Sequence, residues 1–231
     1  MNFADWEPVY EEIIVDFGFD RAADERARDV LADLLGPDHP FDPGRLRTFA
    51  DATVVVAGAA PSLPEEADRA AAPAVDLVVA ASTAADTLRE AGVDVDLMVT
   101  DLDKNPGTVV DLTRAGTPVA IHAHGDNVPA VREWVPQCAA EHLLPTTQAA
   151  PVGPVENYGG FTDGDRGAFL ADAFGAAELR FVGWDLDDPD VDPIKRRKLS
   201  WAERLLAWLE ARRGDRFDVL DGRRDGIEPV A

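Results

Sequence analysis

The stretch Thr53-Val54-Val55-Val56-Ala57-Gly58-Ala59-Ala60-Pro61-Ser62-Leu63 decides the fold, because a β-branched run there ends in a glycine turn. Four more short apolar runs follow it, and amphipathic segments lie between several of them. These runs are residues 75–80, 97–100, 118–122 and 178–182. Strands that alternate with helices are typical of βαβ units. The sequence therefore predicts an α/β fold with a mainly parallel, three-layer, Rossmann-like sheet.

The regions on either side of these runs complete the predicted organisation. Residues 5–35 carry apolar side chains at helical spacing, and the proline- and glycine-rich stretch 36–44 ends that pattern. Residues 1–48 are thus a predicted N-terminal helical segment, which either forms a wall or lid of a binding site or packs against the sheet. Residues 49–231 are a predicted α/β domain. We expect its last helix at about 199–212 and an edge strand at 217–220.

The composition excludes several classes of function. The 231 residues include 44 acidic and 22 basic side chains, and the formal net charge of −22 repels nucleic acid. The start of the chain lacks the features of a signal peptide, and no run approaches the roughly 20 apolar residues of a membrane span. The single cysteine, Cys138, excludes an intramolecular disulfide and a cysteine-rich zinc site. We expect a cytoplasmic protein that binds neither nucleic acid nor a membrane.

The choice of charged residues is also unusual. Arginine far outnumbers lysine, which occurs only as Lys104, Lys195 and Lys198, and aspartate far outnumbers glutamate. This composition is typical of proteins from salt-loving archaea, in which surface carboxylates hold hydration and are screened by concentrated salt. Most aspartates are therefore expected to be surface residues. Those that follow an apolar run are the candidates for a functional site.

Two acidic motifs of this kind predict a metal site. Asp101 and Asp103 lie two residues apart at the end of a predicted strand, so both carboxylates can reach one cation. Asp126 belongs to the motif His-Ala-His-Gly-Asp-Asn at 122–127. Its two histidines suit a transition metal, but the scarcity of other histidines favours Mg²⁺ on Asp126, with His124 either bonding to a phosphate or orienting the carboxylate. The alternatives are a solvated turn for the first motif and a helix cap for the second.

Three further features predict contacts to phosphate groups. The glycine turn after the first strand brings backbone amides close to a phosphate, although a tight strand-to-helix turn explains it equally well. The loop at 159–166, Gly-Gly-Phe-Thr-Asp-Gly-Asp-Arg, combines close backbone approach with an arginine. The basic cluster at 193–199 either holds a triphosphate or faces acidic neighbours at a helix start. The predicted nucleotide-binding residues are Gly58, Ser62, Arg166, Lys195 and Lys198.

Taken in order, these motifs resemble those of the archaeal 6-hydroxymethyl-7,8-dihydropterin pyrophosphokinases, over residues from about 53 to 208. The shared motifs are Gly-Ala-x-Pro-Ser-Leu, Thr-Asp-Leu-Asp, His-x-His-Gly-Asp-Asn, Gly-Gly-Phe-Thr-Asp-Gly-Asp-Arg, Gly-x-Asp (183–185) and a lysine-containing segment that ends in Lys-Leu. These enzymes are similar in fold to the thiamine pyrophosphokinases. Lys104 departs from the family pattern, because relatives often have glycine after the second aspartate.

The resemblance implies that residues 49–231 form a catalytic domain that moves the β,γ-diphosphate of ATP to the hydroxymethyl group of the dihydropterin and releases AMP. It implies Mg²⁺ held by Asp101, Asp103 and Asp126, which with His124 are the expected catalytic residues. The expected substrate-binding residues are Asn157, Phe161, Asp163, Asp165 and Asp185, and the three aspartates among them are also candidates for the metal or for helix capping. ATP and a small pterin are the expected partners, and the product would enter folate or methanopterin synthesis. Homo-oligomer formation is left open.

Three other functions compete with this interpretation. A thiamine pyrophosphokinase would turn over thiamine and not the dihydropterin. A nucleotide-sugar glycosyltransferase also uses an Asp-x-Asp metal site, and it would consume a nucleotide sugar with a preference for Mn²⁺. A non-catalytic nucleotide-binding module would bind ATP without producing AMP.

Overall fold

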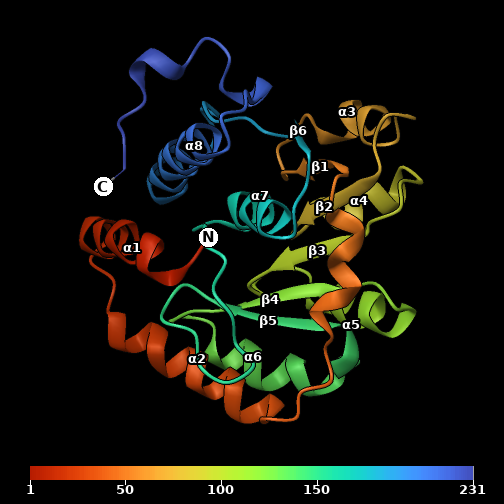
Figure 1. Ribbon diagram of the computed structural model, residues 1–231, viewed down its shortest axis with the longest axis vertical. Helices are drawn as coiled ribbons and strands as arrows, with labels where there is room; N and C mark the ends of the chain where they lie inside the picture. The colour runs from red at the N-terminus through yellow and green to blue at the C-terminus, as the bar shows by residue number, and fades with distance from the viewer. Residues whose placement is uncertain (231) are drawn as a thin grey trace.

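A computed structural model describes residues 1–230 and confirms the predicted α/β class (Figure 1). The described residues form a six-stranded sheet in the order β5-β4-β3-β2-β1-β6, with every pair of neighbours parallel. The strands are β1 (Thr53–Ala57), β2 (Leu77–Ala81), β3 (Leu97–Thr100), β4 (Val119–Ala123), β5 (Leu143–Thr147) and β6 (Glu178–Val182). Because β2 and β6 lie on opposite sides of β1, the strand order reverses at β1.

Helices cover both faces of the sheet (Figure 1). One face carries α2 (Arg21–Leu35), α3 (Leu63–Ala70), α4 (Ala84–Glu90), α5 (Pro106–Ala115) and α6 (Val128–Trp134). The other face carries α1 (Phe3–Phe17), α7 (Asp163–Ala173) and α8 (Pro193–Arg213). Short 3₁₀ helices lie between and after them: η1 (Pro43–Phe49), η2 (Val135–Gln137), η3 (Ala140–His142), η4 (Asp218–Leu220) and η5 (Arg224–Gly226).

The β-branched runs form strands because both faces of the sheet are buried. Along β1, Val54 and Val56 point into the cluster beneath α7, while Val55 and Ala57 point into the cluster beneath α3. Strands that are buried on both sides read as continuous apolar runs, as the sequence shows. Gly167 lets α7 lie directly against the sheet, since a Cβ there would come within 2.9 Å of the Val79 side chain.

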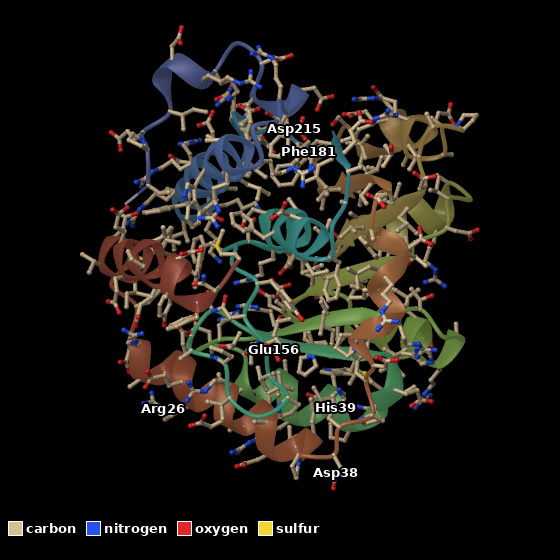
Figure 2. The ribbon with its side chains drawn as sticks, in the orientation of Figure 1. Arg26, Asp38, His39, Glu156, Phe181 and Asp215 are labelled. Atoms are coloured by element: carbon tan, nitrogen blue, oxygen red, sulfur yellow. The ribbon has the colours of Figure 1, made fainter. Side chains whose placement is uncertain are left out.

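No strand was predicted at residues 143–147, where the structure has β5, because Pro145 interrupts the apolar pattern there. The strand lies at the edge of the sheet, and the Pro145 carbonyl accepts a hydrogen bond from the amide of Glu156, on the side away from β4 (Figure 2). The N–H that proline lacks would have pointed to the same side. Proline is therefore tolerated here without loss of a bond to β4.

Two predictions about the C-terminal region are wrong in detail. The expected edge strand at 217–220 is instead η4 preceded by its cap residue Phe217. Phe217 and Leu220 are buried, and the Phe217 ring centroid lies 5.0 Å from that of Phe181. The last helix starts at Pro193, not at about 199, because the Asp192 side chain accepts hydrogen bonds from the amides at its start. The predicted basic cluster therefore forms the first turns of α8.

The two N-terminal helices join different parts of the core. Trp6, Tyr10 and Ile13 of α1 lie in the cluster with α7 and α8, whereas Ala27 and Leu31 of α2 lie in the opposite cluster. The division of the chain into residues 1–48 and 49–231 stays a prediction. Among residues 1–230, no helix combines the length and the apolar character needed to cross a membrane.

Candidate active site

A cleft of about 740 Å³ opens at the carboxyl ends of the strands. Open α/β sheets bind ligands at this edge, near the point where the strand order reverses. The segments after all six strands line it together with the α1–α2 turn and the starts of α2, α7 and α8. The predicted site residues that line the cleft are Gly58, Asp101, Asp103, His124, Asp126, Phe161, Asp163, Arg166, Asp185, Lys195 and Lys198. The described cleft lining does not include the predicted residues Ser62, Asn157 and Asp165.

The loop after β3 holds Asp101 and Asp103 in a strained turn. Leu102 between them has a φ of 69°, in the left-handed region that a leucine seldom adopts. The turn is kept by burial of Leu102 and by a hydrogen bond from its amide to the Thr100 hydroxyl, 3.0 Å long. Strain of this kind is concentrated at functional sites. Here it lets the Asp103 amide donate to Asp101 Oδ1 at 3.2 Å and places both carboxylates at the cleft.

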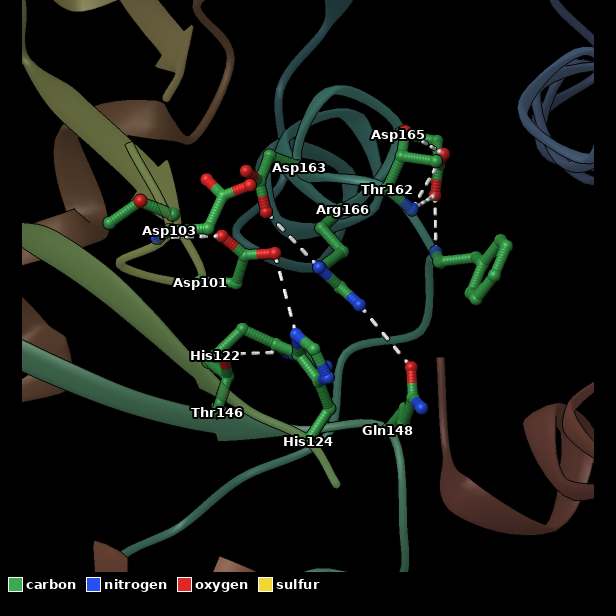
Figure 3. Close-up of polar contacts among 12 residues, drawn as sticks. Asp101, Asp103, His122, His124, Thr146, Gln148, Thr162, Asp163, Asp165 and Arg166 are labelled. Atoms are coloured by element: carbon green, nitrogen blue, oxygen red, sulfur yellow. Dashed lines mark hydrogen bonds and ion pairs between the residues drawn. The ribbon is translucent and has the colours of Figure 1, made fainter. Parts of the chain in front are cut away.

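Three carboxylates crowd together at this point (Figure 3). Burial alone would raise the pKa of Asp101, but hydrogen bonds with His124 and Asp103 outweigh it and lower that pKa below its usual range. The pKa of Asp103 is raised by burial and by Asp101. On α7, burial and the charge of Asp101 raise the pKa of Asp163 to about 7, although Arg166 opposes this. The negative charge of this group favours a bound cation.

The carboxylates do not by themselves form a complete metal cage. In residues 1–230 no three carboxylate, histidine or cysteine side chains are already arranged to hold a metal ion. Asp126 lines the cleft from the loop after β4 and is exposed to solvent. Asp163 is the third carboxylate whose charge acts on the Asp101 and Asp103 pair. The sequence left Asp163 open between metal binding, substrate binding and helix capping.

Only His124 of the two motif histidines lines the cleft. Its Nε2 lies 3.4 Å from the Asp101 carboxylate. His122 is buried, and burial together with Arg166 lowers its pKa, so the ring is neutral. Because the Thr146 hydroxyl donates to the Ile121 carbonyl, His122 Nδ1 donates to that hydroxyl at 3.1 Å. The two rings therefore have separate roles, and they do not support the alternative in which both histidines bind one transition metal.

Positive side chains face the carboxylates across the cleft. All three lysines of the chain, Lys104, Lys195 and Lys198, line it. Desolvation and the neighbouring Lys104 lower the pKa of Lys195, which shows how closely these cations are placed. Arg166 lies almost fully buried between Asp163, at 3.1 Å, and the Gln148 side chain, at 3.3 Å (Figure 3). An anion in the cleft would therefore meet cations from three separate elements.

The main role of the glycine turn after β1 is to let β1 and β6 lie close together. A Cβ on Gly58 would lie 2.6 Å from the Gly183 carbonyl oxygen, so only glycine allows β1 and β6 to continue this close together. The amides of Gly58 and Ala60 bond to the Val182 and Gly183 carbonyls, each at 2.9 Å. This supports the tight-turn interpretation for those two amides. Ser62 precedes α3 without a side-chain capping bond.

Trp184, which the sequence analysis did not nominate, forms part of the cleft wall. Its indole N–H donates to the Val56 carbonyl at 3.0 Å. Its ring also occupies the space beside Gly164, where a Cβ would lie only 2.7 Å away. The next residue, Asp185, is exposed at the cleft and accepts the amide of Asp187 at 3.0 Å.

Two predicted substrate-binding residues hold the loop before α7 instead of facing the cleft. The Asp165 carboxylate accepts hydrogen bonds from the Phe161 amide and from the Thr162 hydroxyl, the latter at 2.6 Å, and so caps α7. Burial raises the pKa of Asp165. The Asn157 side chain donates to the Ala149 carbonyl and accepts the Gly159 amide, both at 2.8 Å.

Three further residues organise the site: Asn127 belongs to the motif at 122–127 but was considered there only for helix capping, and Gln148 and Asp24 carried no recognised sequence signal. Asn127 donates to the carbonyls of Asp101 and His122, at 2.8 and 2.7 Å, and so links the loops after β3 and β4. Gln148 follows β5, so recognition of that strand would have placed it at this edge. Asp24 comes from α2, far from every motif, and only its burial distinguishes it from the other aspartates.

Comparison with known proteins finds a matching family and several similar proteins. Residues 39–191 match the family described as 6-hydroxymethylpterin diphosphokinase MptE-like. A protein of Methanothermobacter thermautotrophicus is 39% identical over 91% of this chain and 95% of its own length. Proteins of Pyrococcus furiosus and Methanocaldococcus jannaschii are 35% and 28% identical, again over 91% of this chain and over 95% and 96% of their own lengths. All three bear the name 6-hydroxymethyl-7,8-dihydropterin pyrophosphokinase.

The family model matches most of the chain, and relatives at 39% and 35% identity match 91% of it. The chain therefore belongs to the MptE-like family of 6-hydroxymethylpterin diphosphokinases.

Proposed function

We propose that this protein transfers diphosphate from ATP to 6-hydroxymethyl-7,8-dihydropterin and releases AMP, in an Mg²⁺-dependent reaction. The observation that carries the proposal is the opposition of charges in one cleft: Asp101, Asp103 and Asp163 face Arg166 and the only three lysines of the chain. A metal–triphosphate complex needs carboxylates to hold the metal ion and cationic side chains to bind the phosphate oxygens. The names of the relatives supply the acceptor.

The donor set fits Mg²⁺. This ion binds through one or two protein carboxylates and completes its coordination with substrate phosphates and water, so a preformed protein cage is not required. Asp101 and Asp103 would hold it, with Asp126 and Asp163 as the competing third carboxylates. When bound, the ion neutralises phosphate charge that builds up during transfer.

The remaining polar side chains position the reactants. Arg166 and the three lysines would bind the phosphate oxygens and keep the attacked phosphorus in line with the acceptor hydroxyl. His124, next to Asp101, is the proposed acceptor of the hydroxyl proton. Asp185 at the cleft edge is available for the nucleotide or the pterin.

The pterin ring needs an aromatic surface. Phe161 and Phe19 both line the cleft, and Phe17 lies against each of them with ring centroids 5.1 Å apart. Phe19 is 38% exposed, which is unusual for a side chain held by two other aromatic rings. We propose that the pterin stacks on Phe19 and Phe161, with its hydroxymethyl group toward Arg166.

The setting of the reaction follows from the same proposal. The product would enter folate or methanopterin synthesis. The acidic composition supports a cytoplasm rich in salt, where the excess of carboxylates is screened.

The test is a substrate comparison. Purified protein is incubated with Mg²⁺ and ATP together with 6-hydroxymethyl-7,8-dihydropterin, thiamine or no acceptor, and AMP is quantified. The proposal predicts AMP only with the dihydropterin. AMP formation with thiamine would instead identify a thiamine pyrophosphokinase, and ATP binding without AMP would identify a non-catalytic module.

A further inference from the structure

A largely buried carboxylate from the N-terminal helices lies in the wall of the cleft. Asp24 of α2 is only 4% exposed, yet three donors surround it. Its Oδ2 accepts the Tyr10 hydroxyl at 2.7 Å and the Gln148 side-chain amide at 2.8 Å, and its Oδ1 accepts the Gly125 amide at 2.7 Å. The family match begins at residue 39 and so does not include Asp24.

The first branch of this network ends at the site arginine. Gln148 donates to Asp24 with Nε2 and accepts from Arg166 Nη2 with Oε1, at 3.3 Å. A side-chain amide has one donating and one accepting end, so the charge of Asp24 fixes which end faces Arg166. The other arm of the Arg166 guanidinium bonds Asp163 at 3.1 Å. The orientation of the arginine is thus set from both sides.

The second branch ends at the loop that carries His124 and Asp126. Asp24 accepts the Gly125 amide, and a Cβ on Gly125 would lie 2.8 Å from the Ala23 side chain. The loop is therefore held against α2 by a charged hydrogen bond and by close packing.

The charge of Asp24 adds little to the stability of the folded protein beyond what an uncharged residue would contribute. Burial of a carboxylate costs free energy, and the hydrogen bonds from its three donors do no more than offset that cost. Apolar replacements of buried charges therefore often stabilise proteins. Specific orientation of other groups is what a buried charge adds. Two anchors keep this network in place, namely the Trp6 indole on the Gln148 carbonyl, at 3.0 Å, and Arg28 on the Ala150 carbonyl, at 2.9 Å.

We infer that Asp24 is a positioning residue for diphosphate transfer: through Gln148 it orients Arg166, and through Gly125 it fixes the loop of His124 and Asp126. This inference rests on the proposed function for its catalytic consequence. It makes the N-terminal helical segment part of the catalytic apparatus, although no group of that segment acts on the reacting atoms.

The test is Asp24→Asn and its rescue. The substitution keeps the shape of the side chain, but the atom that faces Gln148 changes from a hydrogen-bond acceptor to a donor. The Gln148 amide therefore rotates and presents an N–H group to Arg166. We expect kcat to fall about 10-fold or more, with KM for the dihydropterin changed less than about twofold. Adding Gln148→Glu supplies a carboxylate that accepts from both neighbours. The double variant Asp24→Asn/Gln148→Glu should recover kcat to within about threefold of the wild type.

Two variants control for the chemical change and for folding. Asp33→Asn makes the same substitution at an exposed position of α2 and should leave kcat unchanged. Gln148→Met breaks the link from the other side and should reproduce the loss if Asp24→Asn does not fold at the assay temperature. A folded Asp24→Asn with wild-type kcat would overturn the inference, as would a double variant no faster than Asp24→Asn alone.

Failure of the proposed function would be recognised separately. If the wild type transfers no diphosphate, crystal structures of the wild type and of Asp24→Asn still test the network. The inference then requires the Arg166 guanidinium to leave Gln148 in the variant, and an unmoved Arg166 would overturn it.

Discussion

Asp101 lines the cleft, and its carboxylate lies 3.4 Å from His124 Nε2 and accepts the Asp103 amide at 3.2 Å. We expect Asp101→Asn to lower kcat/KM for diphosphate transfer about 100-fold or more, since it removes a full charge that faces the transferred phosphates. Steady-state AMP formation measures this. Asp111→Asn, at an exposed position of α5, is the matched control, and wild-type activity in Asp101→Asn would remove Asp101 from the site.

Asp163 makes the stability of the protein depend on pH. Its folded-state pKa of about 7 lies above the ordinary value of 3.8, so unfolding releases a proton between these pH values. The contribution of Asp163 to the free energy of unfolding is therefore present below about pH 4 and is lost as the pH rises to about 7. In Asp163→Asn this loss is absent.

Thermal unfolding in the presence of a chelator measures that effect. The midpoint of Asp163→Asn relative to the wild type should rise by about 3 °C or more between pH 5 and pH 8. The Asp111→Asn variant should show no such trend. A difference that stays constant with pH would mean that Asp163 is ionised throughout and that the crowding of carboxylates is relieved in some other way.

At the scale of single residues, sequence reasoning found the groups that follow strands and missed those that support them. Asp101, His124 and Arg166 were accessible because each belongs to a motif at the end of an apolar run or before a helix. Gln148 and Asp24 were not, because their roles depend on which segments meet across the cleft. A buried partner on a distant helix leaves no local pattern in the sequence.

The α1–α2 turn is the element whose role changes most. The helices on either side of it pack on the core, as the simpler interpretation of the N-terminal segment expected, whereas the exposed turn itself lines the cleft through Gly18, Phe19 and Asp20. We predict that Phe19→Ala raises KM for the dihydropterin by about 5-fold to 100-fold, since stacking on an aromatic ring contributes about 1–3 kcal/mol. KM for ATP should change less than about twofold.

Initial rates at varied concentrations of each substrate separate the two ring systems. Phe19→Tyr keeps the aromatic face and should behave like the wild type. A rise in KM for ATP alone would place adenine on Phe19 instead of the pterin. Unchanged KM values for both substrates would contradict a stacking role for this turn.

The elements themselves were predicted well where both faces of a strand are buried. The runs that became β1, β3 and β6 have the expected bounds. The misses have local causes, namely Pro145 in an edge strand and a capping aspartate that moves the start of α8. The strand predicted at 217–220 failed because Phe217 and Leu220, three residues apart, both point into the core.

For the whole molecule, the distribution of charge links the fold to the chemistry. The net charge of −22 repels a polyphosphate from most of the surface, and many arginines are engaged in ion pairs with carboxylates. The lysines are instead gathered at the cleft with Arg166. Local positive charge there, together with a metal ion, is what lets so acidic a protein bind ATP.

The central claim is transfer of an intact diphosphate to the pterin, and position-specific labels test it most directly. Wild-type protein is given Mg²⁺, the dihydropterin and ATP labelled in either the α- or the γ-phosphate, and the products are separated. We predict α-label in AMP and γ-label in the pterin diphosphate, in equal amounts. Label from the γ-phosphate in free phosphate, or AMP formed without a labelled pterin, would contradict the account.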